Sequence, residues 1–176
     1  NFVQAAHDAG LYVIQDIVVN HVGDYFKVNV SPIINPQYAS KWSLVTASLP
    51  MTHPEQIPWC FNDPKIFTQQ EFDNNSFYHW TPAISDYNDP NQILIYQMSS
   101  LDDINTTNPV VRNLLRGYFR FWIDKVDIDG YRVDTVKYVE PDFFEDFVNS
   151  TDINNKGIRE HAKSLGKNDF IVFGET

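Results

Sequence analysis

The sequence predicts an α/β fold in which parallel strands are joined by crossover helices. Three segments are predicted to form the strands: 11–19, 128–134 and 169–174. Helical segments alternate with them, and this alternation is typical of a parallel sheet. Polar residues gather just past the carboxyl ends of these strands: Asn20 and His21, then Asp134, then Glu175. Active sites of (β/α)8 barrels and doubly wound sheets lie at that edge, and the sequence favours a barrel because it has no glycine-rich phosphate loop.

The helices are predicted from capping residues and from apolar residues at helical spacing. The clearest helix covers 108–125, where Asn108 suits the cap and Pro109 suits the first helical position. Its apolar face is formed by Val111, Leu114, Leu115, Tyr118, Phe121 and Trp122. Further helices are predicted at three places: residues 2–10, a helix starting near Pro141, and residues 155–165.

Residues 22–100 differ in composition from the rest of the chain. They hold most of the prolines, many Asn and Asp residues and dense aromatics, which predicts turn-rich structure with short strands near 43–46 and 93–98. So long a stretch is interpreted as an inserted subdomain, and most of its aromatics are expected to fill its own small core. The predicted organisation is a barrel segment at 1–21, an inserted subdomain at 22–100 and a barrel segment at 101–176.

Composition and charge exclude several classes of function. The 176 residues carry a net charge of −10, and no basic stripe is present to neutralise the phosphates of a nucleic acid. Cys60 is the only cysteine, so no internal disulfide is expected. No apolar run reaches the length of a membrane span. Both ends of the chain lie in predicted elements, which indicates an internal segment of a longer protein.

Asp134 and Glu175 are the residues best placed for chemistry. They end successive predicted strands, and adjacent parallel strands lie about 4.8 Å apart. Their carboxyl groups are expected to converge to about 5–5.5 Å, the separation in retaining glycosidases, where one carboxylate attacks the anomeric carbon and the other group protonates the leaving oxygen. Arg132, on the same face of its strand, is expected to hold Asp134 ionised. The alternative is a structural ion pair between Arg132 and Asp134, with Glu175 on the surface.

Four short motifs follow one another along the chain: DIVVNH at 16–21, LDDINTTNP at 101–109, GYRVDTVKY at 130–138 and VFGE at 172–175. In this order, with a long insertion after the first, they resemble the signature segments of the α-amylase family of glycoside hydrolases. The resemblance implies a partial (β/α)8 TIM barrel that runs from the helix before the third strand to the end of the fifth strand. It implies that 22–100 is a subdomain protruding between the third strand and the third helix.

The resemblance assigns roles to residues at the strand ends. It makes Asp134 the nucleophile and Glu175 the general acid/base. It makes His21, Arg132 and Lys137 substrate-binding residues. In the family pattern, His21 hydrogen-bonds the sugar in the cleavage subsite, Arg132 also positions the nucleophile, and Lys137 contacts the sugar on the leaving-group side.

Two further implications concern residues around this pair. Asp16 is expected to be a buried structural carboxylate near the site. A third family carboxylate, which stabilises the transition state, is expected beyond residue 176 together with a companion histidine. The segment by itself is therefore expected to be inactive.

The resemblance also implies a structural calcium ion that links the barrel to the inserted subdomain. Asn20 and Asp103 match two of its usual ligands, and the backbone carbonyl of Tyr138 is another; mixed oxygen ligands of this kind suit calcium. The alternative is that Asn20 caps a turn and Asp103 is solvated. Tyr138 replaces a histidine that is frequent in the family, so a side-chain contact to substrate is not carried over to it. Asp102 stands where many members have proline or another residue.

The leading hypothesis is retaining hydrolysis of α-1,4-linked glucan in starch or maltooligosaccharides, and the resemblance favours an extracytoplasmic or secreted location. One alternative keeps the same machinery but transfers the glycosyl group to another sugar, as in cyclodextrin glucanotransferase-like enzymes. A second is a non-catalytic α-amylase-like binding module, which the filled nucleophile and acid positions disfavour. A third is a calcium-stabilised structural fragment whose acidic residues serve only the metal.

Overall fold

The computed structural model describes residues 2–29, 42–44 and 77–176, and the chain forms two compact units. The first unit comprises Asn1–Val19 and Arg112–Thr176, and the second comprises Asn20–Val111. The first unit therefore joins two segments that are far apart in the sequence. Cys60 and most of the predicted inserted subdomain lie outside the described residues.

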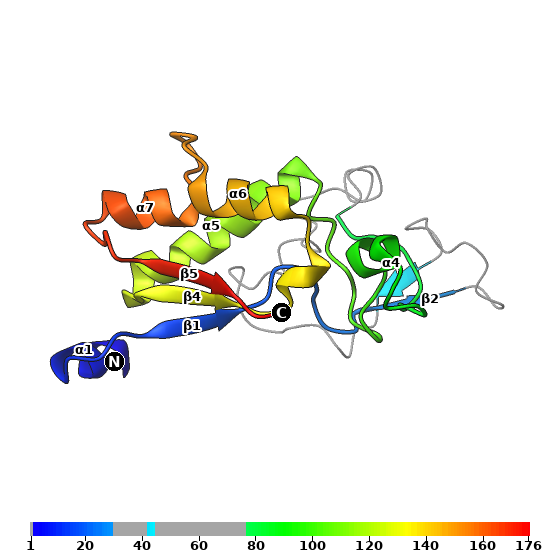
Figure 1. Ribbon diagram of the computed structural model, residues 1–176, viewed down its shortest axis with the longest axis horizontal. Helices are drawn as coiled ribbons and strands as arrows, with labels where there is room; N and C mark the ends of the chain where they lie inside the picture. Colours follow the sequence, from blue (N-terminus) through cyan, green and yellow to red (C-terminus); the bar gives the residue numbers. More distant parts are fainter. Residues whose placement is uncertain (1, 30–41, 45–76) are drawn as a thin grey trace. The chain divides into compact units, whose positions relative to one another are not determined.

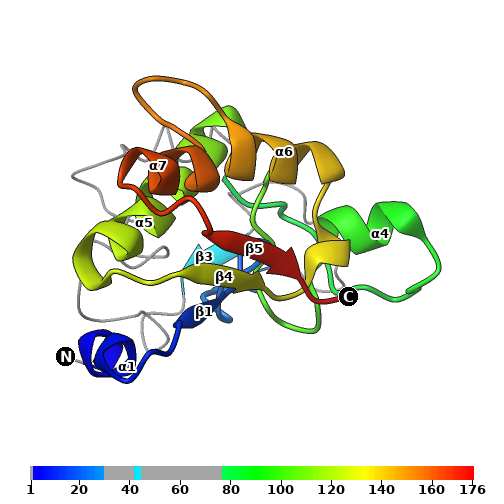
Figure 2. The same cartoon turned by 60° about the vertical axis from the view of Figure 1, so that its left-hand side comes forward.

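A parallel sheet forms the centre of the first unit. It contains β1 (Ile14–Ile17), β4 (Gly130–Val133) and β5 (Ile171–Gly174) in the order β1-β4-β5, and both strand pairs are parallel. The three predicted strands and their parallel arrangement are therefore confirmed, although each strand is shorter than the predicted segment. Helices α5 (Pro109–Val126), α6 (Pro141–Asn149) and α7 (Ile158–Ser164) lie along one side of this sheet (Figures 1 and 2).

Three of the four predicted helices begin where the sequence predicts, whereas α7 begins at Ile158 rather than at residue 155. The amide of Val110 donates to Asn108 Oδ1 at 2.9 Å, and Pro109 is the first residue of α5. A side-chain acceptor at the cap satisfies an amide that has no partner inside the helix, and proline loses nothing at the first position. Pro141 opens α6 in the same way, and the N-terminal α1 (Phe2–Asp8) is also present as predicted.

Aromatic side chains join the sheet to the helices that cover it. Tyr131 of β4 is fully buried, and its ring centroid lies 5.6 Å from that of Phe119 in α5 and 5.5 Å from that of Phe170. Phe119 in turn lies 5.7 Å from Phe147 of α6 in an edge-to-face arrangement. The hydroxyl of Tyr131 donates to the Phe119 carbonyl, and burial raises the pKa of this hydroxyl. The covered face of the sheet is therefore closely packed around Tyr131, and the buried hydroxyl of Tyr131 has a hydrogen-bond partner.

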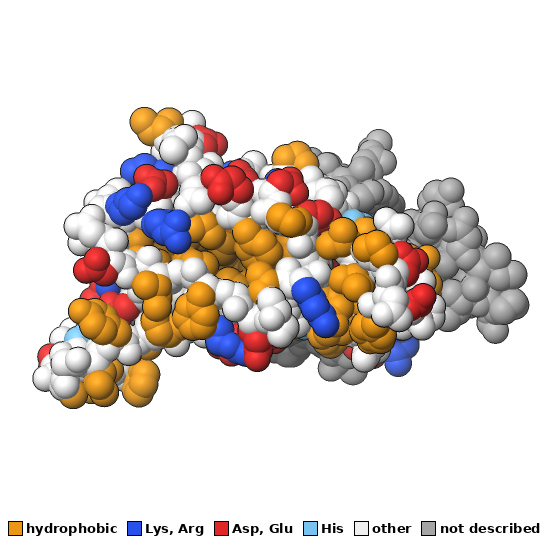
Figure 3. Space-filling view, viewed as in Figure 1, with side chains coloured by type: hydrophobic (Ala, Val, Ile, Leu, Met, Phe, Trp, Pro, Cys, Tyr) orange, Lys and Arg blue, Asp and Glu red, His pale blue; other side chains and the backbone are white. Residues whose placement is uncertain are grey.

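The opposite face of the sheet is open. Side chains alternate between the two faces of a strand, so Asp16 and Arg132 share this face with Ile171 and Phe173, which are each 48% exposed. A Cβ on Gly130 would lie 2.7 Å from Ile171 Cγ1, so a glycine is needed between the strands on this face. Hydrophobic side chains gather in Figure 3 where Figure 1 draws β4 and β5.

The second unit contains a small antiparallel sheet and one described helix. The strands are β2 (Phe26–Val28) and β3 (Trp42–Leu44), and the helix is α4 (Pro90–Ile95). The rings of Phe26, Tyr78 and Trp80 lie 5.0, 5.0 and 5.4 Å from one another, as expected for a small aromatic core. β3 overlaps the strand predicted near 43–46, of which residues 45–46 lie outside the described part.

The strand predicted near 93–98 is wrong, because Pro90–Ile95 is the helix α4. The side chain of Asp89 accepts from the amide of Asn91 at 2.9 Å, and Pro90 occupies the first turn. These two residues start a helix in a segment whose apolar residues also suit a strand. Among the described residues, no helix is long and apolar enough to cross a membrane.

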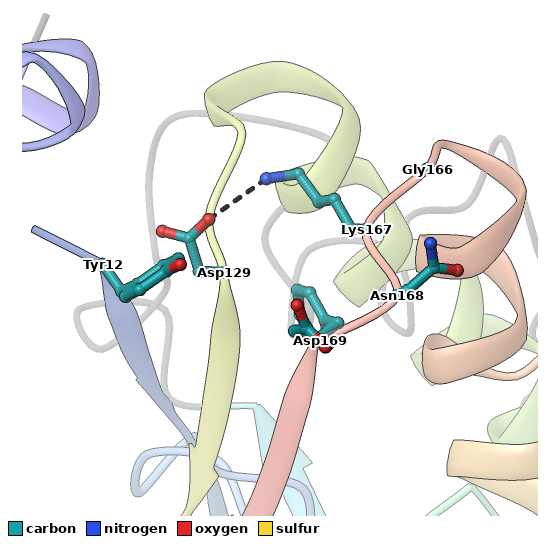
Figure 4. A pocket seen from close by; sticks show the side chains of 7 residues that line it. Tyr12, Asp129, Gly166, Lys167, Asn168 and Asp169 are labelled. Atoms are coloured by element: carbon teal, nitrogen blue, oxygen red, sulfur yellow. Dashed lines mark hydrogen bonds and ion pairs between the residues drawn. The ribbon is translucent and has the colours of Figure 1, made fainter. Parts of the chain in front are cut away.

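A cluster of charged side chains lies at the amino-terminal edge of the parallel sheet. The Asp129 carboxylate, just before β4, accepts from the Val13 amide at 2.8 Å, is bonded to His7 Nε2 at 2.8 Å, and accepts from Lys167 Nζ at 3.3 Å. Figure 4 shows Asp129 and Lys167 pointing toward one another beside Tyr12, which lines the same hollow. These bonds fasten α1 and the segments that enter β1, β4 and β5.

The cluster favours the charged form of both its carboxylate and its ammonium group. Burial opposes the charge on Asp129, but the hydrogen bonds from Val13, His7 and Lys167 outweigh it and hold the pKa of this carboxyl below its ordinary value. Burial also opposes the charge on Lys167, whose bonds to Asp127 and Asp129 nevertheless raise its pKa. The Asp129 contribution to stability is therefore present above its unfolded pKa and is lost as the pH falls through the lowered one.

Replacing Asp129 with Asn should lower the free energy of unfolding by about 1–3 kcal/mol at pH 7, because charge-assisted hydrogen bonds are lost. The difference from wild type should shrink in acid. Asp129 of the unfolded chain takes up a proton below its ordinary pKa of 3.8, and the wild-type advantage is then lost as the pH falls through the lowered pKa of the folded chain. Urea denaturation at pH 7 and pH 2.5 measures both effects. Asp169→Asn, which alters an exposed carboxylate of the same hollow, is the control and should change stability by less than about 0.5 kcal/mol. A loss of equal size at both pH values would contradict this role.

Candidate active site

Asp134 and Glu175 lie at the same edge of the parallel sheet, as predicted. Asp134 follows β4 directly, and its amide donates to the Ile17 carbonyl of β1 at 2.9 Å. Glu175 follows β5 directly, and its amide donates to the Val133 carbonyl at 2.9 Å. The parallel ladder thus continues one residue beyond each strand and brings the two acidic residues to neighbouring backbone positions.

Arg132 bridges two carboxylates that come from the strands on either side of it. Its Nη1 donates to Asp16 Oδ2 and its Nη2 donates to Glu175 Oε2. Asp16 is the register partner of Arg132 in the β1–β4 pair. One planar guanidinium therefore orients two acidic side chains at once, which a lysine ammonium does not do with the same geometry.

Two expectations about this cluster are corrected. Arg132 was expected to pair with Asp134, but its ion pairs among the described residues are with Asp16 and Glu175. The reason is geometric, because neighbouring strands are about 4.8 Å apart whereas residues two apart on one strand are about 6.6 Å apart. Asp16 was expected to be buried, but its side chain is 58% exposed because it lies on the open face of the sheet.

The chain reverses immediately after Asp134. Thr135 has φ 57° and ψ 32°, in the left-handed region, and the 3₁₀ helix Val136–Tyr138 follows. Lys137 is exposed on this turn, with Nζ 5.1 Å from the centroid of the Tyr138 ring. The turn therefore presents the predicted substrate-binding lysine close in sequence to Asp134 while Tyr138 is largely buried.

The remaining predicted site residues, Asn20, His21 and Asp103, come together within the second unit. His21 and Asp103 form an antiparallel bridge, and the Ile104 amide donates to the Asn20 carbonyl at 2.7 Å. Asn20 is 1% exposed and Asp103 is 2% exposed. Asp103 Oδ2 is bonded to His79 Nδ1 at 2.6 Å, so Asp103 is a buried carboxylate rather than the solvated one of the alternative reading.

Asp102 was given no role from the sequence, yet its carboxylate organises the backbone around it. It accepts from the amides of Tyr25 at 2.6 Å and Phe26 at 2.9 Å, and from Gln97 Nε2 at 3.0 Å. Burial raises its pKa to about 7, although the two amide hydrogen bonds oppose that shift. Its amide partners are 76 and 77 residues away in the sequence, so no local pattern could have identified them.

His79 was also given no role from the sequence, because its partner Asp103 is 24 residues away and no local pattern connects the two. Within the part of the chain that the structure describes, no three His, Cys, Asp or Glu side chains form a metal-binding group. The predicted calcium ligands are of a different kind, because they combine an amide oxygen, a carboxylate and a backbone carbonyl. Asn20 and Asp103 belong to the second unit, and Tyr138 belongs to the first.

The family of the chain follows from comparison with known proteins. The model of the α-amylase catalytic domain matches residues 1–175, so this chain belongs to the α-amylase family. A β/α-amylase from Paenibacillus polymyxa is 30% identical over 82% of the chain and 9% of that protein. A cyclomaltodextrin glucanotransferase from Klebsiella oxytoca is 28% identical over 58% of the chain and 14% of that protein.

The fold is matched by solved structures of the same family. The crystal structure of an α-amylase from Anoxybacillus has a TM-score of 0.60 and 26% identity, over 99% of this chain and 27% of that one. Together with the parallel strands and alternating helices, this likeness shows that the chain is part of a (β/α)8 barrel. The chain spans between 9% and 27% of the length of these relatives.

A double-mutant cycle tests the bridge made by Arg132. Arg132→Gln and Asp16→Asn, singly and together, should show a coupling free energy of unfolding of about 0.2–1 kcal/mol, the range for partly exposed ion pairs. Urea denaturation at low ionic strength measures it, and added salt should reduce it. The control cycle pairs Arg132→Gln with Asp152→Asn, in the loop between α6 and α7, and should be additive. Additivity in the Arg132–Asp16 cycle would exclude the ion pair in solution.

Proposed function

We propose that the protein containing this chain is a retaining α-glucan glycosidase that hydrolyses α-1,4-glucosidic bonds in starch or maltooligosaccharides. The observation that carries the proposal is the backbone pairing that puts Asp134 and Glu175 side by side at the carboxyl edge of the sheet. Membership in the α-amylase family supports the substrate class. Because the chain covers a minor part of its relatives' length, the activity is proposed for the full-length protein.

In the first step of this reaction, Asp134 acts as nucleophile and Glu175 as general acid. A carboxylate oxygen of Asp134 attacks the anomeric carbon while protonated Glu175 gives its proton to the glycosidic oxygen. The bond from the anomeric carbon to that oxygen breaks, the leaving sugar departs with a hydroxyl group, and a glycosyl ester of Asp134 remains. In the second step Glu175 takes a proton from water, the water oxygen attacks the anomeric carbon, and Asp134 is released as a carboxylate.

The neighbouring residues support this pair in the proposal. Arg132 provides a positive charge between the carboxylates of Asp16 and Glu175 and fixes the orientation of Glu175 through one arm of its guanidinium. Its second arm holds Asp16, which acts as a positioning residue on the open face. His21 hydrogen-bonds the sugar, and Lys137 contacts sugar on the leaving-group side; both roles follow from their places in the family motifs.

We further propose that β1, β4 and β5 are the third, fourth and fifth strands of the barrel. The open face of the sheet supports this position, because a barrel interior is lined by side chains from one face of each strand. Ile171 and Phe173 would then be interior residues. Residues 22–100 would be the subdomain inserted after the third strand, and the third family carboxylate would lie outside these 176 residues, so the segment alone would be inactive.

Substitution of Asp134 by Asn in the full-length protein tests the mechanism. With maltoheptaose as substrate, kcat should fall by about 10³-fold or more, because the covalent step loses its nucleophile. Product chromatography of the wild-type reaction should show maltose and maltotriose. Asp169→Asn, at the other edge of the sheet, should retain wild-type kcat. Unchanged cleavage by the Asp134→Asn enzyme would refute the catalytic assignment.

Glycosyl transfer to a second sugar is the alternative activity. The similarity to a cyclomaltodextrin glucanotransferase favours it, and a sugar hydroxyl can replace water in the second step without any change in Asp134 or Glu175. The same maltoheptaose digest separates the two, since longer or cyclic products would dominate if transfer is the main reaction. A non-catalytic binding module is less favoured, because the nucleophile and acid positions are both filled.

We also propose that Asn20 and Asp103 provide side-chain oxygens to a structural calcium ion, as their places in the family motifs imply. The donor set fits, because calcium prefers oxygen ligands of mixed type. The burial of Asn20 and Asp103 on two bridged segments supports a preformed pair of ligands. His79, bonded to one oxygen of Asp103, would fix the orientation of that carboxylate toward the ion.

Removal of calcium should lower the melting temperature of the full-length protein. A ligand at 100 times its dissociation constant stabilises the folded state by about 2.7 kcal/mol. EDTA followed by CaCl₂ or MgCl₂, monitored by thermal denaturation, measures the effect, and calcium should restore stability more fully than magnesium. Asp103→Asn should abolish the calcium-dependent increment, whereas Asp86→Asn, at an exposed residue, should keep it. An increment that survives in Asp103→Asn would place the ion elsewhere.

A further inference from the structure

Glu175 is bound to the chain on both sides of Asp134. Its amide donates to the carbonyl of Val133 at 2.9 Å, and its carbonyl accepts from the amide of Val136 at 3.2 Å. The first bond belongs to the strand ladder, but the second comes from the turn that follows Asp134. The backbone of Glu175 is therefore fixed to the residue before Asp134 and to the second residue after it.

The second bond depends on the reversal of the chain at Thr135. Thr135 is a β-branched residue with φ 57°, a conformation that such residues rarely adopt. From there the 3₁₀ helix begins, and Val139 donates back to the Val136 carbonyl at 3.3 Å. Figures 1 and 2 both draw this turn beside the end of β5. The strained residue thus directs the turn toward β5.

Gly174, the last residue of β5, provides the space in which this turn sits. A Cβ built on Gly174 would lie 2.3 Å from Cγ2, 2.8 Å from Cγ1 and 3.1 Å from Cβ of Val136. All three side-chain carbons are close, so a change of the Val136 rotamer does not remove the clash. The backbone of Gly174 does not have a positive φ, so the requirement for glycine is one of space.

We propose that Val136 and Gly174 are positioning residues whose contact sets the spacing between the nucleophile Asp134 and the acid/base Glu175. The proposal rests on the proposed glycosidase function. A retaining mechanism needs a separation of about 5–5.5 Å between the two carboxyl groups. Any side chain at residue 174 displaces the turn from β5, stretches the Val136–Glu175 bond and moves Asp134 relative to Glu175.

The test is a double-mutant cycle in the full-length enzyme with maltoheptaose as substrate. Gly174→Ala should lower kcat by about 10²-fold with little change in KM, because misplacement of about 1 Å between reacting groups costs about that much. Val136→Ala should lower kcat only a few-fold, as the turn loses a packing contact. In Gly174→Ala/Val136→Ala the two clashing γ-carbons are gone and only the Cβ of residue 136, at 3.1 Å, remains close. A small shift relieves that contact, so kcat should recover most of the way to the level of Val136→Ala.

The control substitution is Gly117→Ala in α5, where a new Cβ meets nothing within 4 Å. It should leave kcat and KM at wild-type values. The pH profile of kcat/KM provides a readout that a merely structural role would not change. A new spacing between two coupled carboxyl groups moves the limbs of the profile in Gly174→Ala, whereas partial unfolding lowers its height and leaves the limbs in place.

The outcomes separate this inference from the function on which it rests. If Asp134→Asn abolishes cleavage but Gly174→Ala does not reduce kcat, the positioning role is wrong and the glycosidase assignment stands. If Gly174→Ala reduces kcat and Val136→Ala does not rescue it, the contact is not the cause and the proposal also fails. If Asp134→Asn cleaves normally, the proposed function itself fails.

Discussion

Parallel pairing of β1, β4 and β5 is the constraint on which the rest of the first unit depends. Because all three strands run the same way, their carboxyl ends meet at one edge, and the residues that follow them meet there too. The ladder does not stop at the strands, since the amides of Asp134 and Glu175 each pair with the strand before them. Asp134 and Glu175 are 41 residues apart in the sequence. Their positions in the sheet are fixed by backbone hydrogen bonds, which do not depend on side-chain rotamers.

The two edges and the two faces of this sheet differ in what they contribute to the structure. Helices and the rings around Tyr131 cover one face and give the sheet a packed support. At the amino-terminal edge, Asp129 and Lys167 form an ion pair that holds together the segments leading into β4 and β5. The carboxyl edge and the open face carry Asp134, Glu175 and the bridge that Arg132 makes between Asp16 and Glu175. The stabilising bonds around Asp129 and the proposed chemistry thus lie at opposite ends of the same strands.

Arg132 lies in the predicted site, but its ion-pair partners differ from the predicted one. Its position two residues before Asp134 suggested a contact along the strand, but its guanidinium spans across the sheet to Asp16 and Glu175. Cross-strand neighbours are nearer than same-face neighbours on one strand, and that difference decides the pairing. The result places a cation beside the acid/base residue of the proposed mechanism, and it makes Asp16 an exposed partner rather than a buried one.

The sequence by itself determined the three strands of the parallel sheet, the four helices of the first unit that it predicted except for their exact ends, the cap at Asn108 and the family, because each is encoded in residues that are neighbours along the chain. It also identified Asp134 and Glu175 as strand-end acids. The partners of Arg132 and the carboxylate contacts of Asp102 were decided only by the tertiary structure. Apart from the bond between Gln97 and Asp102, those contacts join residues between 43 and 116 positions apart. A linear pattern carries no information on distances that arise only when the chain folds.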